Sequence, residues 1–515
     1  MKKLGQANSN TKTCIISCIL TCLVFVLISS GLAYSRANGC SVEVAIPILT
    51  ITLFVVLAVL SFWVGKSGQG ISDTTIIYVI VWGIAVRLFY VALTQGHFFQ
   101  NDIGSFEEDN LGHLGYVYYI FSNNSLPDVV PQMSYQFYHP PFYYMISALV
   151  SKIFVFCGGQ IEQVDEALQY VSVAYSGIVL IYLNKILKHI DISHTGRFVA
   201  MALITFLPYS VMMSGALNND LLMYMLSVMC VYYFLKWYET PKYPYIIATA
   251  VCIGLAMMTK ISAALLVPGM TIVMVMKLWQ QRKNLKNILL QFGSFGVIAL
   301  PIGMWFPLYN YFKYDTPLGF VPRMADTFDQ FIGQYSKWQR LFDFNGAMDS
   351  IVLSWTGSNG YIDYNIWVSL LKFAVTGEGY NVYLNTVLSV VAHIAFYMTL
   401  LIIFGIIIGM FVFLFGDKRN VHVKILFFIT VLVSMLSYLK FCLSYTHVCT
   451  MHIRYVMLAY YMGCILAGGG LETILNRLQV KNKKTAKILM ISTHCFIWLY
   501  MIMVSLLYLN LEFVL

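Results

Sequence analysis

The chain has 515 residues, of which 59% are hydrophobic and only 11% are charged. Soluble domains carry about 25% charged residues, so the composition excludes an ordinary soluble globular protein. Apolar runs of about 20 residues, the length needed to cross a bilayer, recur along the chain. The sequence therefore predicts an all-α polytopic membrane protein, because backbone surrounded by lipid must satisfy its own hydrogen bonds. The net charge of +9 gathers in short loops between the apolar runs, a pattern typical of membrane orientation and not of nucleic-acid binding.

Two apolar runs in residues 1–74 predict an N-terminal transmembrane hairpin with spans at 14–34 and 44–64. Lys2 and Lys3 precede the first apolar run, but no clear small-residue cleavage pattern follows it. We therefore interpret this run as a retained anchor and not as a cleaved signal peptide. No function for the hairpin can be inferred from its residues.

About 13 spans are expected in all, with a transmembrane core at 75–310 and C-terminal helices at 390–515. The segment 138–157 is also apolar, but Lys152 and a double proline favour a helix lying at the membrane interface. After the hairpin, the remaining spans are expected at 75–95, 168–189, 197–216, 221–238, 243–259, 262–278, 288–310, 390–414, 421–441, 454–473 and 487–510.

Basic residues predict the orientation of these spans. With a cytoplasmic N-terminus, the inner loops hold Lys66, Lys185, Lys188, Lys236, Lys242, Lys418, Arg419 and the basic runs 277–286 and 477–487. This is the expected positive-inside bias. Two long outer segments remain, a first outer loop at 96–167 and a second at 311–389, and long loops in a compact protein usually carry function.

The first outer loop concentrates acidic residues in a chain that has only 23 of them. Asp102, Glu107, Glu108 and Asp109 precede His113, and a helical turn would place Asp109 and His113 on one face. Such carboxylates can act as general bases or hold a divalent cation. The alternative is a solvated loop that simply avoids lipid. The motif Tyr138-His139-Pro140-Pro141 follows in the same loop.

Polar residues also mark two further span ends that are expected on the outer face. Asn218, Asn219 and Asp220 precede a span; helix capping explains one asparagine but not the whole motif. Lys260 lies between two spans, where an ionisable residue is a functional candidate and a snorkelling lysine is the alternative.

Two more candidates come from the C-terminal half. Arg454 is an outer base whose guanidinium suits a phosphate, unless it forms a structural pair with a loop carboxylate. Glu378 lies in the second outer loop and is otherwise a turn residue. Cys442 and Cys449 share an outer loop and could form a disulfide, although nothing in the sequence sets their geometry.

The order of these motifs resembles the GT-C-type membrane glycosyltransferases that use polyprenyl-phosphate sugars. Within them, residues 75–475 look most similar to bacterial relatives of the dolichyl-phosphate-mannose protein mannosyltransferases, a glycosyltransferase family 39-like group. The residues that carry the resemblance are the acidic first loop, Tyr138 to Tyr144, Asn218 to Asp220, Gly254 to Lys260 and Arg454-Tyr455.

The resemblance implies a multi-pass hexosyltransferase of the cell membrane with an active site on its outer face. The donor would be a polyprenyl-phosphate sugar, the acceptor a lipid, a protein or a wall glycan, and nucleic acid is not an expected partner. An acid of the first loop would activate the acceptor. Asp102 and Asp109 both qualify, with Glu107 nearby; Asp109, His113 and Tyr116 match a family pattern with one extra residue, and Asp102 lies closer to the helix end.

The resemblance also implies a set of donor-binding residues. Lys260 and Arg454 would hold the donor phosphate, and Glu378 is carried over weakly because Thr376 stands where relatives have Phe. A lysine or arginine can replace a metal at a leaving phosphate, so no cofactor is certain and a divalent cation stays possible. The predicted donor-binding set is His113, Tyr138, His139, Asn219, Asp220, Lys260 and Arg454.

Two other classes of protein fit the composition. A secondary transporter or lipid-linked-sugar flippase would usually carry broken helices and charges near mid-membrane. The charges here lie at span ends, which favours the enzyme. A non-catalytic envelope assembly protein would keep the fold without needing the carboxylates.

Overall fold

A computed structural model describes residues 2–37, 45–67, 71–94, 96, 102–104, 106, 112–133, 136–354, 361–377 and 386–509. This part of the chain is built of helices and connecting segments, with an isolated β-bridge between Phe331 and His447. Eleven helices are long and apolar enough to cross a membrane, or twelve if a bent pair counts as one span. The prediction of an all-α polytopic membrane protein is confirmed.

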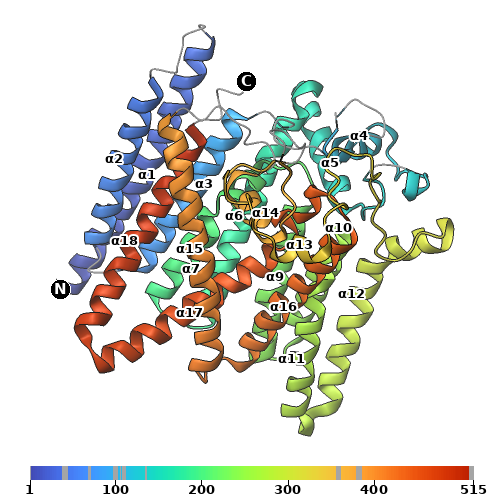
Figure 1. Cartoon of the computed structure of the whole chain (residues 1–515). Coiled ribbons are helices and arrows are strands. Elements are labelled where there is room, and N and C mark those ends of the chain that lie inside the picture. The colour runs from blue at the N-terminus through green and yellow to red at the C-terminus, as the bar shows by residue number, and fades with distance from the viewer. Residues whose placement is uncertain are drawn as a thin grey trace.

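The helices pack side by side in a bundle (Figure 1). Their bounds are α1 (Lys2–Ala37), α2 (Ala45–Ser67), α3 (Asp73–Leu93), α4 (Gly112–Asn123), α5 (Phe142–Phe156), α6 (Val164–His189), α7 (His194–Phe206), α8 (Pro208–Met212), α9 (Asp220–Glu239), α10 (Tyr243–Thr259), α11 (Val267–Gln280), α12 (Leu285–Tyr314), α13 (Lys337–Phe342), α14 (Ile366–Thr376), α15 (Thr386–Gly416), α16 (Val421–Ser444), α17 (Met457–Lys481) and α18 (Lys483–Leu507).

Each of the 13 expected spans coincides with helix, but two differ from a simple crossing. The expected span 197–216 is divided into α7 and α8, which are bent by 64°. Pro208 begins α8, and its missing N–H ends the hydrogen bonding of the preceding helix. The expected span 243–259 is α10, with only 17 residues. The interfacial segment contains α5, whose 15 residues are fewer than the roughly 20 of a spanning helix.

A buried arginine braces the bend between α7 and α8. The guanidinium of Arg87 donates to the carbonyl oxygen of Thr205 at 3.0 Å and to the hydroxyl of Ser210 at 3.0 Å. Its Nε donates to the hydroxyl of Ser176 at 2.8 Å. Backbone groups freed at a helix break must find partners away from water, and Arg87 supplies them. The brace fixes α8 and therefore the direction in which the chain approaches α9.

Close backbone contact aligns α17 with α7. A Cβ added to Gly196 would lie 2.5 Å from the carbonyl oxygen of Gly468, and a Cβ on Gly468 would lie 2.6 Å from the carbonyl oxygen of Gly196. Only glycine permits such an approach, which is a common device at helix contacts in membranes. The contact holds α17, whose first turn follows the segment that carries Arg454.

The turns with many basic residues gather at one end of the bundle. Arg419 pairs with Asp417 and Glu472 at 2.8 Å each, and the other carboxylate oxygen of Glu472 accepts from the backbone N–H of Ser193 at 2.7 Å. In Figure 1 the α11–α12 turn lies at the lower end of the bundle, whereas α4 and α5 lie at the upper end. The two ends therefore differ as the sequence predicts; their orientation across a membrane stays a prediction.

The cysteine pairing considered from the sequence is wrong. Neither Cys442 nor Cys449 forms a disulfide. The Cys442 thiol donates to the carbonyl oxygen of Thr450 at 3.2 Å, while the Cys449 sulfur lies 3.7 Å from the sulfur of Met324. Because the two side chains have different partners, their shared loop does not bring the sulfur atoms together.

Candidate active site

A cavity of about 640 Å³ opens where several helices end. The carboxyl ends of α10, α12 and α16 and the amino ends of α9 and α17 contribute to it, together with the segments before α4 and α5. These ends lie opposite the basic turns. Its titratable side chains include most of the predicted site residues, namely Asp102, His113, Tyr138, His139, Asp220, Lys260 and Arg454.

The backbone around Asp102 is folded onto the start of α4. The backbone N–H of His113 donates to the carbonyl oxygen of Asp102 at 3.1 Å, and that of Leu114 donates to Ile103 at 2.7 Å. These bonds satisfy donors that a helix leaves unpaired in its first turn. Gly112 has a φ of +65°, and a Cβ there would lie 2.2 Å from the Ile103 backbone. The glycine therefore allows the loop to close and fixes Asp102 beside the cavity.

Asp102 forms an ion pair with Arg454 from the far end of the chain. Oδ2 of Asp102 lies 3.1 Å from Nη1 of Arg454 and 3.7 Å from Nε2 of His113. Burial opposes ionisation of this carboxyl, but Arg454 and His113 outweigh it and hold its pKa well below the usual range. Asp102 is thus an anion that faces the cavity.

A second ion pair lies deeper in the same cavity. Nζ of Lys260 lies 2.6 Å from Oδ1 of Asp220, and the two side chains are 15% and 3% exposed. Asn218 accepts the backbone N–H of Asp220 at 3.0 Å, and Asn219 donates to the carbonyl oxygen of Thr259 at 2.9 Å. Asn219 therefore ties the start of α9 to the end of α10, and its side chain does not line the cavity.

Backbone contacts hold Arg454 in place. Its N–H donates to Nδ1 of His452 at 3.0 Å, and its carbonyl oxygen accepts from the hydroxyl of Tyr224. The His452 ring lies 4.5 Å from that of Tyr209 and 4.3 Å from that of Phe373, between centroids. Burial and the nearby Arg454 lower the pKa of His452 well below its usual range. A neutral ring keeps Nδ1 available as an acceptor.

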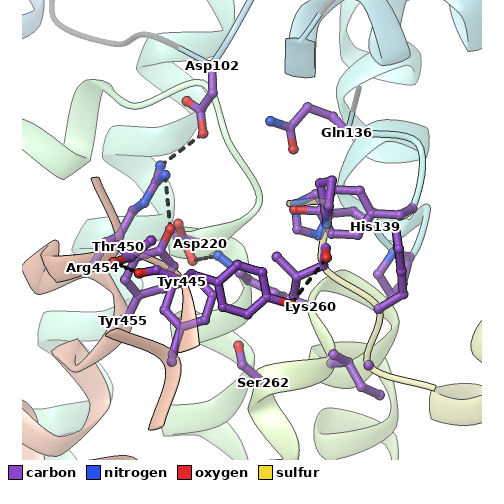
Figure 2. Close-up of a pocket in the computed structure, with 18 of the residues that line it drawn as sticks. Asp102, Gln136, His139, Asp220, Lys260, Ser262, Tyr445, Thr450, Arg454 and Tyr455 are labelled. Carbon is purple, nitrogen blue, oxygen red and sulfur yellow. Dashed lines mark hydrogen bonds and ion pairs between the residues drawn. The ribbon is translucent and has the colours of Figure 1, made fainter. Parts of the chain in front are cut away.

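Histidine and tyrosine rings form the wall beside α4 and α5. The His113 ring stacks on His139 with centroids 5.7 Å apart, and Nδ1 of His113 is 2.8 Å from the hydroxyl of Tyr144. Tyr138 packs on His139 at 4.1 Å. Burial, Lys260 and His113 lower the pKa of His139 well below its usual range, so this wall is neutral at His139. Figure 2 shows Asp102 and Arg454 facing His139 across the cavity.

The cavity lining also includes apolar side chains. Residues of α9, α16 and α17 and of the 3-10 turn Ile261–Leu266 contribute to it, among them the apolar residues Met223, Leu265 and Leu458. Ser434 of α16 also lines the cavity and lies ten residues before the last residue of that helix, Ser444, which corresponds to about 15 Å along the helix. The cavity therefore combines charged and apolar lining residues.

A segment of the second outer loop crosses the other side of the cavity. We call residues 317–335 the strap. Phe331 and His447 form a β-bridge, and the N–H of Ile332 donates to Thr446 at 2.9 Å. The strap supplies Arg323 to the cavity wall, and this guanidinium lies 5.9 Å from the ring centroid of Tyr445.

Three predicted site residues, Glu107, Asp109 and Glu378, lie outside the described residues. Asp102, one of the two alternatives for the base, lines the cavity. Helix α4 begins at Gly112, so His113 is in its first turn, while the expected start of that turn at Asp109 lies outside the described residues. Among the residues that the structure describes, no three His, Cys, Asp or Glu side chains form a group that could hold a metal ion.

Two residues at the site were not among the predicted site residues. Gln136 lines the cavity just before the Tyr138-His139 motif, and the buried Tyr144, which follows that motif, is bonded to His113. The sequence analysis selected charged residues because they are scarce in this apolar chain. Gln136 and Tyr144 are uncharged and were therefore not selected. Their closeness to the motif was the available signal.

Comparison with known proteins identifies the class of the central segment. Residues 138–305 match the family described as dolichyl-phosphate-mannose-protein mannosyltransferase. This segment carries Tyr138, His139, Asp220 and Lys260. The resemblance predicted from the motifs is thus confirmed for this segment, and the chain is a polytopic membrane protein whose residues 138–305 are similar to that family. No curated protein sequence matches the chain.

Solved structures with related helix arrangements have little sequence identity to the chain. The apo oligosaccharyltransferase of Archaeoglobus fulgidus is 12% identical with a TM-score of 0.47, covering 86% of this chain and 56% of its own. The chain thus spans little more than half the length of that enzyme. ArnT from Cupriavidus metallidurans bound to undecaprenyl phosphate is 11% identical with a TM-score of 0.37, and 78% of each chain is covered.

Proposed function

We propose that the protein is an integral-membrane hexosyltransferase. It transfers a sugar from a polyprenyl-phosphate-linked donor to an acceptor on the outer face of the membrane. One observation carries the proposal: the ion pairs Asp102–Arg454 and Asp220–Lys260 line one cavity, whose lining also includes apolar side chains. The family match to residues 138–305 supports the same class of reaction.

The charged and the apolar lining residues of the cavity fit the two chemical parts of such a donor. The apolar side chains contact the first isoprene units, because burying these units removes apolar surface from water. Lys260 uses one of its three donors on Asp220, and Arg454 carries five N–H groups. Both can therefore contact a phosphate while they keep their carboxylate partners. This places the sugar between the phosphate and Asp102.

The reaction is an inverting displacement at the anomeric carbon of the sugar. The acceptor hydroxyl attacks this carbon, the bond from carbon to the phosphate oxygen breaks, and the acceptor proton passes to the carboxylate of Asp102. The leaving polyprenyl phosphate gains one negative charge, which Lys260 and Arg454 stabilise. His113 lies 3.7 Å from Asp102 and orients its carboxylate. The proton then leaves to water when the product departs.

The test is transfer by the purified protein in lipid nanodiscs. Polyprenyl-phosphate hexoses with a radiolabelled sugar are offered together with a cell-envelope extract containing lipid, protein and glycan acceptors. Wild type is expected to move label from the lipid to an acceptor. Asp102→Asn is expected to reduce the rate at least a hundredfold, within the range that a general base contributes. The control Asp326→Asn changes an exposed carboxylate of the strap and should retain the wild-type rate.

Other outcomes point to the other classes of protein. Movement of intact labelled lipid between leaflets without cleavage would identify a flippase. Binding without cleavage or movement would identify an assembly protein. Equal rates for wild type and Asp102→Asn would remove Asp102 from the mechanism and return the role of base to Asp109.

A further inference from the structure

Gln136 has a buried side-chain amide without a hydrogen-bond partner among the residues that the structure describes. The residue is 7% exposed, and its amide oxygen accepts no hydrogen bond. Its amide nitrogen likewise donates none to the residues that the structure describes. A buried acceptor that loses water without gaining a partner is destabilising, and such groups are rare in native proteins. An amide in this state fits a residue that binds a ligand.

The backbone of Gln136 directs this amide toward the cavity. Its φ is +64°, in the left-handed region that residues other than glycine seldom adopt. The N–H of His139 donates to the carbonyl oxygen of Gln136 at 3.0 Å, which closes a turn. In Figure 2 the amide lies between Asp102 and His139 and points into the cavity. Unfavourable backbone conformations of this kind cluster at functional sites.

The amide oxygen of Gln136 limits which chemical groups of a ligand could bind to it. A carbonyl oxygen needs an O–H or N–H donor, and neither an ionised phosphodiester nor a polyprenyl chain has one. The amide nitrogen of Gln136 needs an acceptor, and the described carboxylates of the cavity are already paired with Arg454 and Lys260. Sugar hydroxyls supply the donor, and they also accept from the amide nitrogen. The amide therefore matches two neighbouring hydroxyls of a hexose.

We infer that Gln136 recognises hydroxyl groups of the donor sugar and determines which hexose the enzyme accepts. This inference rests on the proposed function, because it takes the cavity to hold a polyprenyl-phosphate sugar. In the bound state the amide oxygen accepts from one sugar hydroxyl, and the amide nitrogen donates to its neighbour. Lys260 and Arg454 bind the phosphate independently of the sugar.

The experiment compares lipids with and without the sugar. Equilibrium binding to the protein in nanodiscs is measured for undecaprenyl phosphate and for its mannosyl, glucosyl and galactosyl phosphodiesters. Gln136→Met retains the length of the side chain but removes both hydrogen-bonding groups. It is expected to weaken binding of the preferred sugar-bearing lipid about tenfold, the range for one or two neutral hydrogen bonds, while binding of undecaprenyl phosphate stays unchanged.

Gln132→Met is the matched control. Gln132 also lines the cavity, but it is exposed and donates to the carbonyl oxygen of Tyr314 at 3.3 Å. This variant should bind every lipid as wild type does. Deoxy analogues of the preferred sugar add a second comparison: removing the recognised hydroxyl should weaken binding to wild type but not to Gln136→Met.

Thermal unfolding separates recognition from a structural role. Because the Gln136 amide has no partner in the fold, Gln136→Met should unfold at the wild-type temperature or above it. A lower unfolding temperature, or equal weakening of undecaprenyl phosphate and the sugar lipids, would overturn the inference. Wild type that binds none of the lipids would refute the proposed donor and this inference together. Wild-type binding that Gln136→Met matches would refute only the inference.

Discussion

Arg454 keeps Asp102 ionised, and Arg454→Gln should therefore make activity fail as the pH is lowered. Nη1 of Arg454 lies 3.1 Å from Oδ2 of Asp102. At an effective dielectric constant of about 20, opposite charges at this distance attract by about 5 kcal/mol. A tenfold change in proton affinity corresponds to about 1.4 kcal/mol. Since His113 still supports the anion, we expect the proton affinity of the carboxyl to rise by about a hundredfold or more.

The sign of the effect follows from the direction of the pKa shift. In wild type the pKa of Asp102 lies well below its usual range, so this carboxyl stays ionised down to acidic pH. Without Arg454, burial raises this pKa, and the carboxyl, which we propose as the base, becomes protonated as the pH falls. The stability that the ionised Asp102 contributes is complete above its unfolded pKa of about 3.9 and is lost only below it, as the pH falls through the folded pKa. The variant lacks this contribution.

The assay measures initial rates of sugar transfer at saturating donor between about pH 4.5 and about pH 8.5, the range in which a raised carboxyl pKa becomes visible. Arg323→Gln is the control, because Arg323 lines the same cavity without an ion pair to any carboxylate in the described part of the chain. Its profile should have the wild-type shape. An acidic limb at the same pH in Arg454→Gln and wild type would refute the electrostatic reasoning.

Three further predictions concern stability and thiol state. Lys260→Met leaves the buried carboxylate of Asp220 unpaired and should cost about 3–5 kcal/mol; adding Asp220→Asn should restore most of the unfolding temperature in detergent, and no recovery would contradict the pairing. Arg87→Met removes the brace at the α7–α8 bend and should cost at least about 3 kcal/mol by the same measurement; an unchanged melting curve would contradict the brace. Reducing agent should leave the unfolding temperature unchanged, and maleimide should label both Cys442 and Cys449 after denaturation without reduction; protection of both thiols would indicate a disulfide.

The helices and the chemical groups of the site could be predicted from the sequence because charge is scarce in it. Asp102, Asp220, Lys260 and Arg454 each interrupt or border an apolar run, and an ionisable side chain there has few places to lie. All four residues line one cavity, and the face of the membrane on which it lies stays a prediction. Their pairing could not be predicted, because it depends on how helices far apart in the sequence pack.

Features that depend on backbone conformation or on neutral side chains could not be predicted from the sequence either. Nothing in the sequence shows that Gln136 has a positive φ or that its amide lacks a partner. The bend at Pro208 was visible as a proline near a span end, but the brace by Arg87 depends on the packing of α3 against α7 and α8. Glycine contacts such as Gly196 with Gly468 are likewise set by tertiary packing.

The sequence separation of 352 positions from Asp102 to Arg454 has a consequence for biosynthesis. A chain that grows from its N-terminus exposes Asp102 long before the ribosome makes its cationic partner. Until the segment before α17 is in place, the carboxylate has burial without compensation and should be neutral or hydrated. The Asp102–Arg454 ion pair therefore forms only after the segment before α17 has been synthesised, so a nascent protein that stops short of this segment lacks the pair. Assembly itself would restrict the chemistry to fully inserted molecules.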